Sequence, residues 1–384
     1  MKTILILGAG QFQVPVIKKA KKLGYKTIVT DYDSKAEGFK FADIALNIST
    51  LDKEKTLQVA KIYNIDGILT TSDFPVRTVA YVCKKMNLIG LSTRAAEIST
   101  DKFLLRECIK KNNIPCPKYL LLNDKKDIYS EKLKGFEFPL IIKPVDSSAS
   151  RGVCKVYNLQ ELELAYEEAY YYSKSGKVIL EEFLDGLEYS VETLTQNGIN
   201  NIVAITEKHT SGYPYFVEDR HIVPAYLNKE QEYKIKDMIN KVINAIGIDN
   251  SSSHAEIKLT EKGPILIEIG ARLGGDYITS DLVPLSTGID MLENIINISV
   301  GKKIKLSNSK IKYSGIQFIT YENYEKIKKN EKNIRKDNSI IKFYFDHNKN
   351  NELKSSLDRN GFYIVCSDNK EKLINVLDKY IKYK

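Results

Sequence analysis

The sequence is poor in the features that define several common classes of protein. Its five cysteines are dispersed, odd in number and without CxxC spacing, which disfavours a disulfide framework or a zinc site. No apolar run approaches membrane-spanning length, and the short apolar start MKTILILGAGQ has no signal-peptide cleavage region. Arginines are nowhere interleaved with aromatics in a stripe. We therefore expect a cytoplasmic protein with neither a membrane nor a nucleic acid as its partner.

The overall composition is that of a soluble globular protein. Of the 384 residues, 43% are hydrophobic and 28% are charged, and a chain of this length favours about two to four lobes over a single core. The net charge of +9 comes mostly from lysines that are scattered on helix faces and crowded in the tail. Such a diffuse excess is typical of a soluble surface, and it is compatible with attraction of a polyanionic nucleotide.

Residues 1–95 alternate between strand and helix patterns. This βαβα order predicts a parallel sheet with helices on both faces. The strands are expected at residues 3–7, 27–30, 42–48 and 67–71, and the helices at 14–23, 53–63 and 77–86.

The first turn of this region, from Gly8 to Gln13, is similar to a dinucleotide-binding turn, and Asp31 follows at roughly the right distance. However, Gln13 stands where the third glycine is required, so an NAD-dependent oxidoreductase is disfavoured. A two-glycine turn at a helix N-terminus still offers backbone amides to a small substrate. Gly10 and Gln11 are therefore candidate substrate residues.

A new pattern begins at Thr100, which we expect to be the N-cap of a helix over residues 101–112. Asn- and Lys-rich stretches at 323–338 and 346–351 are expected to be turns or surface. Further strands are expected at 119–122, 139–143, 153–156, 178–182, 188–194, 202–206, 315–320, 340–344 and 362–366, and helices at 159–172, 228–246, 290–300 and 370–382.

The stretch 254–276, HAEIKLTEKGPILIEIGARLGGD, has two short β-type runs on either side of a turn at Gly263. Their alternation of apolar and polar residues predicts a β-hairpin. Successive strand side chains point to opposite faces, so Glu256 and Glu268 are expected to lie opposite each other, with Arg272 close behind.

Two carboxylates this close repel each other, and a hard divalent cation is the natural reason to keep them together. Mg²⁺ suits one or two carboxylates plus phosphate oxygens, and a neighbouring arginine suits a developing phosphoryl charge. The adjacent Gly274 and Gly275 allow close approach of a ligand. On this stretch alone, an acidic surface hairpin without a function stays an open alternative.

A loop of small residues, KPVDSSASRGV, begins at Lys143 between two expected strands. Its backbone N–H groups and hydroxyls can wrap phosphate oxygens, which Lys143 reaches from the strand end. It is not a P-loop, because the lysine precedes the small residues. The alternative is a solvent-exposed serine-rich turn.

An acidic strand end, VILEEFLDGLEYSVE, follows at residues 178–192. An apolar strand runs into carboxylates, turns at Gly186 and continues into a new strand that Glu188 opens. Backbone groups of such a hinge can hydrogen-bond an adenine edge, and a carboxylate can accept from ribose hydroxyls. By itself the stretch is also compatible with a simple strand–turn–strand.

Together these stretches resemble the ATP-grasp superfamily over roughly residues 1–305. Their order is that of the family, and within it the chain looks most like carboxylate–amine (amino-acid) ligases of the carbamoyl-phosphate-synthetase-like branch. The resemblance implies an α/β fold: a Rossmann-like pre-ATP-grasp domain at 1–97, a two-lobed α+β ATP-grasp domain at 98–305 with a lid at about 118–184, and a small C-terminal α+β lobe at 306–384.

The resemblance also implies roles for individual residues. Glu256 and Glu268 would bind Mg²⁺, with Mn²⁺ as the alternative ion, while Arg272, Lys143 and His221 would be catalytic. One departure is clear: many members read E-x-N-x-R with the Asn as a third metal ligand, whereas Gly270 occupies that place here. ATP would be bound by Lys102, Lys143, Ser147, Ser148, Ser150, Arg151, Gly152, Glu181, Glu182, Leu184 and Glu188.

The segment 207–224 holds two of the four histidines of the chain. In amino-acid ligases of this type a comparable segment lines the acceptor site, although a polar surface loop is the alternative. The substrate residues would then be Gly10, Gln11, His209, Glu218, His221, Arg272, Gly275 and Asp276.

We expect an ATP- and Mg²⁺-dependent ligase that joins a small-molecule carboxylate to an amine through an acyl-phosphate, releasing ADP and phosphate. The alternatives are a purine-pathway enzyme of the same superfamily, acting on a ribotide with formate or bicarbonate, and a non-catalytic ATP-binding module. For the assembly, we keep a homodimer as an alternative to a monomer.

Overall fold

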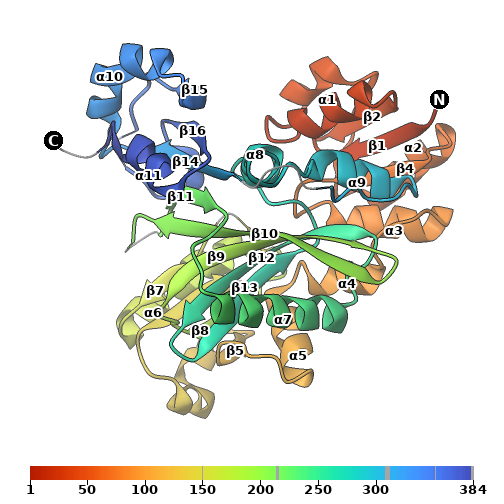
Figure 1. Ribbon diagram of the computed structural model, residues 1–384. Helices are drawn as coiled ribbons and strands as arrows, with labels where there is room; N and C mark the ends of the chain where they lie inside the picture. The colour runs from red at the N-terminus through yellow and green to blue at the C-terminus, as the bar shows by residue number, and fades with distance from the viewer. Residues whose placement is uncertain (149, 213–215, 308–311, 351, 382–384) are drawn as a thin grey trace.

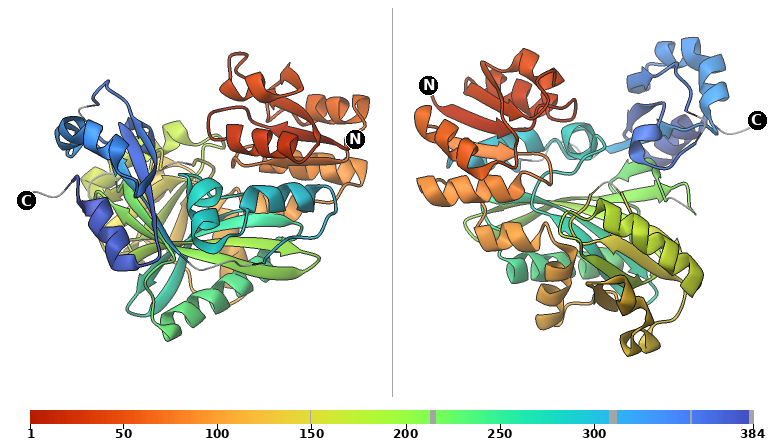
Figure 2. Two further views of the ribbon diagram at one scale, coloured as in Figure 1. Left: turned by 45° about the horizontal axis from the view of Figure 1, so that its top comes forward. Right: turned by 180° about the vertical axis from the view of Figure 1, so that it is seen from behind.

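The computed structural model describes residues 1–148, 150–212, 216–307, 312–350 and 352–381. Within these residues the strands form three sheets. In Figure 1 the N-terminal unit is red and orange, the central unit runs from yellow to green, and the C-terminal unit is blue. The views in Figure 2 show the N-terminal and C-terminal units on the same side of the central one.

The N-terminal unit is a parallel sheet of order β3-β2-β1-β4, as the alternating patterns predicted. Alternate residues of β1 enter two different hydrophobic clusters, which explains why the apolar run is continuous. The elements are β1 (Thr3–Leu7), α1 (Val14–Lys22), β2 (Lys26–Asp31), the 3₁₀ helix η1 (Glu37–Phe41), β3 (Ile44–Asn47), α2 (Lys53–Ile62), β4 (Gly67–Thr70) and α3 (Val76–Met86).

Two helices, α4 (Thr93–Ile98) and α5 (Lys102–Lys111), follow this sheet. The prediction that Thr100 caps α5 is wrong, because Asp101 accepts the Leu104 amide at 2.9 Å and is the N-cap. Thr100 instead accepts a hydrogen bond from Arg77 at 2.6 Å. The cap places Lys102 at the start of the helix.

The lid is a four-stranded sheet of order β5-β8-β6-β7, and the buried side of α6 packs on it. The buried residues Leu162, Ala165 and Ala169 of α6 have the spacing of one helix face. The elements are β5 (Tyr119–Leu122), the 3₁₀ helices η2 (Lys125–Tyr129) and η3 (Glu131–Gly135), β6 (Leu140–Pro144), β7 (Cys154–Val156), α6 (Leu159–Tyr172) and β8 (Val178–Glu182).

The central sheet carries the predicted hairpin at its edge and runs on into the C-terminal unit, in the order β13-β12-β9-β10-β11-β14-β16-β15. The strand β11 had not been predicted, because its EDRHIV sequence shows little alternation of apolar and polar residues. The central elements are β9 (Leu187–Gln196), β10 (Ile199–Thr210), β11 (Glu218–Val223), α7 (Lys229–Ile246), β12 (Ser251–Thr260) and β13 (Gly263–Gly270).

The C-terminal unit contains a helix that the sequence had assigned to turns or surface at residues 323–338. That prediction is wrong: Tyr324, Ile327 and Ile334 of α10 are buried at helical spacing, and the surrounding Lys and Asn residues hide the period. The elements are β14 (Tyr313–Ile319), α10 (Tyr324–Lys336), β15 (Ile340–Phe345), the 3₁₀ helix η5 (Ser356–Asp358), β16 (Gly361–Ser367) and α11 (Lys370–Asp378).

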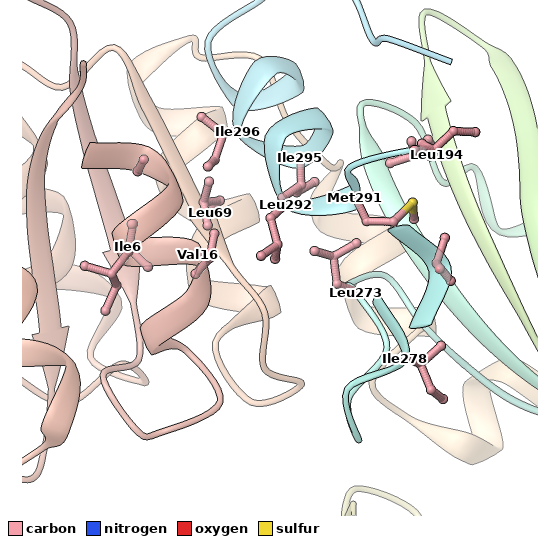
Figure 3. Packing of buried hydrophobic residues seen from close by; sticks show 14 of the residues in the cluster. Ile6, Val16, Leu69, Leu194, Leu273, Ile278, Met291, Leu292, Ile295 and Ile296 are labelled. Atoms are coloured by element: carbon pink, nitrogen blue, oxygen red, sulfur yellow. The ribbon is translucent and has the colours of Figure 1, made fainter. Parts of the chain in front are cut away.

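One hydrophobic cluster joins the N-terminal sheet to the segment after the hairpin (Figure 3). In it Ile6, Val16 and Leu69 face α9 (Met291–Ser299), and Leu273 and Ile278 extend the same cluster toward the central sheet. A short π-helical turn η4 (Ile278–Leu282) and helix α8 (Val283–Thr287) lie between the hairpin and α9. Among the described helices, none is long and apolar enough to cross a bilayer.

Candidate functional site

A cavity of about 170 Å³ lies between the lid and the hairpin. It brings together residues that are far apart in the sequence, because β6 and β8 of the lid and β12 and β13 of the central sheet open onto it. Of the residues predicted from the sequence, it is lined by Lys102, Lys143, Ser147, Ser148, Ser150, Arg151, Glu181, Glu182, Leu184, Glu188, Glu218, Glu256 and Glu268. Gly10 and Gln11 line a different cavity, at the carboxyl ends of the N-terminal strands.

Glu256 and Glu268 are directly paired across the β12–β13 hairpin, as the alternation predicted. Each carboxylate contacts a lysine: Lys208 Nζ lies 2.6 Å from Glu256 and Lys102 Nζ lies 3.2 Å from Glu268. Burial raises the pKa of Glu256, but Lys208 and His254 outweigh it, so the pKa stays well below its ordinary value. Glu256 is therefore held in its charged, ligand-competent form.

The histidine at the start of the hairpin, His254, contacts Glu256 and a second carboxylate. His254 lies 2.6 Å from the fully buried Glu192 through Nδ1 and 3.4 Å from Glu256 through Nε2. Burial opposes its charged form, yet the neighbouring carboxylates, above all Glu192, raise the pKa of His254 to about 9. The imidazolium thus helps to fix the position of Glu256, as groups that hydrogen-bond a metal ligand do.

The lysine of the serine-rich loop belongs to a buried ion-pair cluster. Lys143 lies 2.7 Å from Glu181, whose other partner Arg106 binds it with two hydrogen bonds of 2.8 and 3.2 Å. Burial raises the pKa of Glu181, but the two cations outweigh it and bring the pKa to about 2. For Lys143 burial prevails over its partner, and its pKa is lowered. The carboxylate of Glu181 faces this cluster, so its backbone is the part left for a ligand in the cavity.

We expect Glu181→Gln to lower the free energy of unfolding by about 3–5 kcal/mol, because it leaves Arg106 and Lys143 buried without a counter-charge. The wild-type contribution of this carboxylate is present above its unfolded-state pKa and is lost as the pH falls toward 2. Urea denaturation at pH 7 measures the loss. The matched control, Glu131→Gln, removes an exposed pair with Lys134 and should change little; equal effects of the two variants would contradict the prediction.

The serine-rich loop lines one part of the cavity. Lys102 donates to the Ser147 carbonyl at 2.7 Å, and Arg151 donates to the Ser148 carbonyl at 3.1 Å while its guanidinium lies 5.5 Å from the Phe74 ring. Gly152 has a φ of +70°, and a Cβ there would lie 3.2 Å from both Pro144 and Ala169, so a side chain at this position would be strained. The loop also contains Ala149, which lies outside the described residues.

The hinge lies at the other end of the cavity. The Lys118 amide donates to Glu182 at 2.9 Å, and Lys258 lies 3.1 Å from Glu188. The ring of Phe183 has the ammonium of Lys155 at 3.5 Å from its centroid. This end therefore combines an aromatic face, exposed strand-end backbone and a carboxylate, which is what a base and a sugar require.

Arg272 is held by a residue of the N-terminal unit that the sequence did not reveal. Asp73, just after β4, accepts two hydrogen bonds from its guanidinium, at 2.7 and 2.9 Å. A Cβ at Gly270 would lie 3.0 Å from Asp73 Oδ1, so the glycine leaves room for this ion pair. That contact gives a physical reason for the missing asparagine at position 270.

The residues predicted for the acceptor side separate into two groups. His221, which pairs with Lys208 across β10 and β11, lies on the cleft face of the sheet, and its Nε2 is 3.7 Å from Asp276. His209 is next to Lys208 and so points to the opposite face, where it contacts Glu207 at 2.8 Å. The structure does not bring His209 to the cleft. Residues 213–215 of this segment lie outside the described residues.

Several residues of the site escaped the sequence reasoning. His254 could have been found, because it shares a strand face with Glu256. Asp73 and Arg106 could not, since their partners Arg272 and Glu181 are 199 and 75 positions away. Among the described residues, no group of three or more His, Cys, Asp or Glu is placed to hold a metal ion. The two hairpin glutamates are a pair, which suits an ion that takes its other ligands from phosphate and water.

Comparison with known protein families gives a match to the ATP-grasp domain over residues 136–281. Alanine–anticapsin ligase of Bacillus subtilis is 28% identical over 269 residues, covering 64% of this chain and 56% of the relative. Phosphoribosylamine–glycine ligase of Pyrococcus furiosus is 23% identical over 362 residues, covering 87% and 78%. The chain spans about half the length of the first curated relatives that it matches.

Solved structures share the fold along the entire chain. The L-amino acid ligase of Bacillus licheniformis superimposes with a TM-score of 0.81 at 21% identity, covering 100% of this chain and 99% of that structure. A likeness at this identity shows the fold.

Proposed function

The chain contains an ATP-grasp domain and has the fold of ATP-grasp ligases throughout, and from this premise we propose that it is an ADP-forming ligase that joins a carboxylate to an amine. The observation that carries the proposal is the paired Glu256 and Glu268 facing the lid lysine Lys143 across one cavity. A non-catalytic ATP-binding module would not require Arg272 to be held in place beside these carboxylates.

The hairpin glutamates fit a divalent cation such as Mg²⁺ or Mn²⁺. Both are carboxylates on one strand face, and each contacts a lysine that a cation bound with phosphate could displace. When bound, the ion would offset the negative charge of the ATP phosphates. Glu256 and Glu268 would be its protein ligands.

The remaining residues would bind and orient the substrates. Lys102, Lys143 and the loop from Ser147 to Gly152 would hold phosphates, and the hinge with Glu182, Leu184 and Glu188 would hold the nucleoside. Arg272 would stabilise charge on the phosphoryl group as it moves to a substrate carboxylate. An amine would then displace phosphate, and the closed loop would keep water from the acyl-phosphate.

We propose the three domains that the sequence indicated and a role for each of them. The region 1–97 would contribute to the acceptor side, 98–305 would bind ATP, and 306–384 would close the site. A location in the cytoplasm and a homodimer remain predictions.

A second candidate is a purine-pathway ligase, because phosphoribosylamine–glycine ligases match 72–78% of their own length. The charge of the cavity around Gly10 and Gln11 argues against this alternative. Its charged lining residues are Asp31, Asp33, Glu37 and Lys35, so negative charge prevails where a phosphorylated acceptor would meet the N-terminal sheet. An amino-acid substrate is therefore favoured over a ribotide.

We expect purified protein to release phosphate and ADP from Mg-ATP only when a carboxylate and an amine are both supplied. A coupled ADP assay over a panel of amino acids, amino-sugar acids and ribotides with glycine, formate or bicarbonate measures this. Mass spectrometry of the products identifies the new amide. If no pair stimulates ADP formation although ATP binds, the ligase proposal fails; stimulation by a ribotide alone selects the purine alternative.

A further inference from the structure

The segment 272–277, here called the Arg272 loop, links the hairpin to η4. It begins with Arg272 and continues through two glycines to Asp276 and Tyr277. A Cβ on Gly275 would meet nothing within 4 Å, so this part of the loop faces open space. A Cβ on Gly274 would lie 2.6 Å from His254 Nδ1, so the other side of the loop is tightly packed on the site.

The far end of the loop has an unusual backbone. Asp276 and Tyr277 are consecutive non-glycine residues with φ of +49° and +62°. Such left-handed conformations are unfavourable for residues with a Cβ, and they persist only where the surroundings impose them. The question is which contacts impose them here.

The C-terminal unit supplies these contacts. Arg359, two residues before β16, donates two hydrogen bonds to the Asp276 carboxylate, at 2.9 and 2.6 Å. Its guanidinium lies 3.7 Å from the centroid of the Phe318 ring, and its side chain is 7% exposed. The ring of Tyr277 packs on Phe362 of β16, with the centroids 4.2 Å apart.

The loop is thus tied at both ends by bidentate Arg–Asp pairs to different units. Asp73 of the N-terminal unit holds Arg272, and Arg359 of the C-terminal unit holds Asp276. Between the two pairs, two hydrogen bonds hold the backbone of the loop. Thr279 Oγ1 donates to the Gly274 carbonyl at 2.5 Å, and the Ile278 amide donates to the Gly275 carbonyl at 2.9 Å.

We propose that Arg359 is a positioning residue of the ligase: by holding Asp276 it fixes the Arg272 loop, and through it the C-terminal unit completes the acceptor side of the site. His221 belongs to the same arrangement. It is buried, its Nε2 lies 3.7 Å from Asp276, and neither ring nitrogen has a hydrogen-bond partner among the described residues. The loop therefore carries Arg272 and holds Asp276 beside His221 of β11. The catalytic part of this inference rests on the proposed function; the structural part does not.

The test compares Arg359→Met with Arg220→Met. Arg220 is a matched control, because it forms another ion pair between the central sheet and the C-terminal unit, with Asp378 at 2.7 Å, without touching the Arg272 loop. Hydrogen–deuterium exchange of peptides covering 272–282 needs no substrate. We expect exchange there to be at least about tenfold faster in Arg359→Met and unchanged in the control.

With a substrate pair identified, kcat of Arg359→Met should fall by up to about 100-fold, because a displaced group away from the chemistry has effects of this size. The KM for ATP should not change. Arg359→Lys, which retains the charge but not the paired hydrogen bonds, should be intermediate. It also carries the test if the Met variant does not fold.

The outcomes are separable from those of the proposed function. Equal exchange in the two Met variants overturns the inference whatever the enzyme does. Faster exchange with an unchanged kcat overturns the positioning role. If exchange is faster but the protein forms no amide with any substrate pair, the role of Arg359 in holding the loop is supported and the ligase proposal is contradicted.

Discussion

Glu268→Gln should lower kcat by at least about 10³-fold while leaving the fold intact. The substitution keeps the size and the hydrogen-bonding shape of the side chain, but it removes one of the two carboxylate charges of the hairpin. Loss of a group that only supports a metal ligand already costs about 10–100-fold, and a ligand should cost more. Steady-state ADP release with a productive substrate pair gives kcat, and circular dichroism confirms the fold.

The same variant gives a readout that does not depend on turnover. Calorimetric titration of ATP with and without Mg²⁺ should show a strong metal dependence in the wild type, which Glu268→Gln loses. Glu261→Gln, in the exposed turn of the same hairpin, is the control and should behave as the wild type. Full activity or unaltered metal dependence of Glu268→Gln would remove the hairpin from the mechanism.

Arg272→Lys should reduce kcat by about 10²–10³-fold, the effect of removing one fixed donor to a developing oxyanion. Lysine retains the charge, but it cannot make the paired hydrogen bonds that Asp73 accepts from the guanidinium. The variant should bind Mg-ATP with nearly wild-type affinity, since Lys102 and Lys143 are untouched. Single-turnover ADP formation separates this chemical defect from binding.

Asp73→Asn provides the complementary measurement, because we expect Asp73 to act on the reaction through Arg272, which it holds. Its effect should be smaller, about 10–100-fold, as for other groups that orient a functional side chain. The double variant should be little worse than Arg272→Lys alone, since the two residues act as one unit. Additive losses would show that Asp73 has a separate role, and a fully active Asp73→Asn would show that the pair is dispensable.

The elements with strong local patterns could be predicted closely. The strand β1, the helix α6 and the strand β8 have the boundaries that their apolar periodicity indicated. The opposition of Glu256 and Glu268 followed from alternation alone, because strand geometry fixes which side chains share a face. In contrast, α10 and β11 escaped prediction, since their apolar positions are few and are surrounded by charged residues.

Long-range ion pairs account for most of what the sequence did not reveal about the site. Each partner of Asp73–Arg272, Arg106–Glu181 and Asp276–Arg359 is an ordinary charged residue in its own stretch. Which charges meet depends on how the three units pack, and that packing is produced by the hydrophobic cluster around α9 and by the β11–β14 pairing. Local periodicity carries no information about either.

The sequence by itself therefore determined which groups are available: a hairpin with two carboxylates, a lysine with a serine-rich loop, and a hinge, in an order that resembles that of ATP-grasp proteins. These features depend on neighbouring residues and on strand alternation, which are local. The tertiary structure decided how the chemistry is held in place. It paired Arg272 with Asp73 and Asp276 with Arg359, because only folding brings charges from distant parts of the chain to one loop.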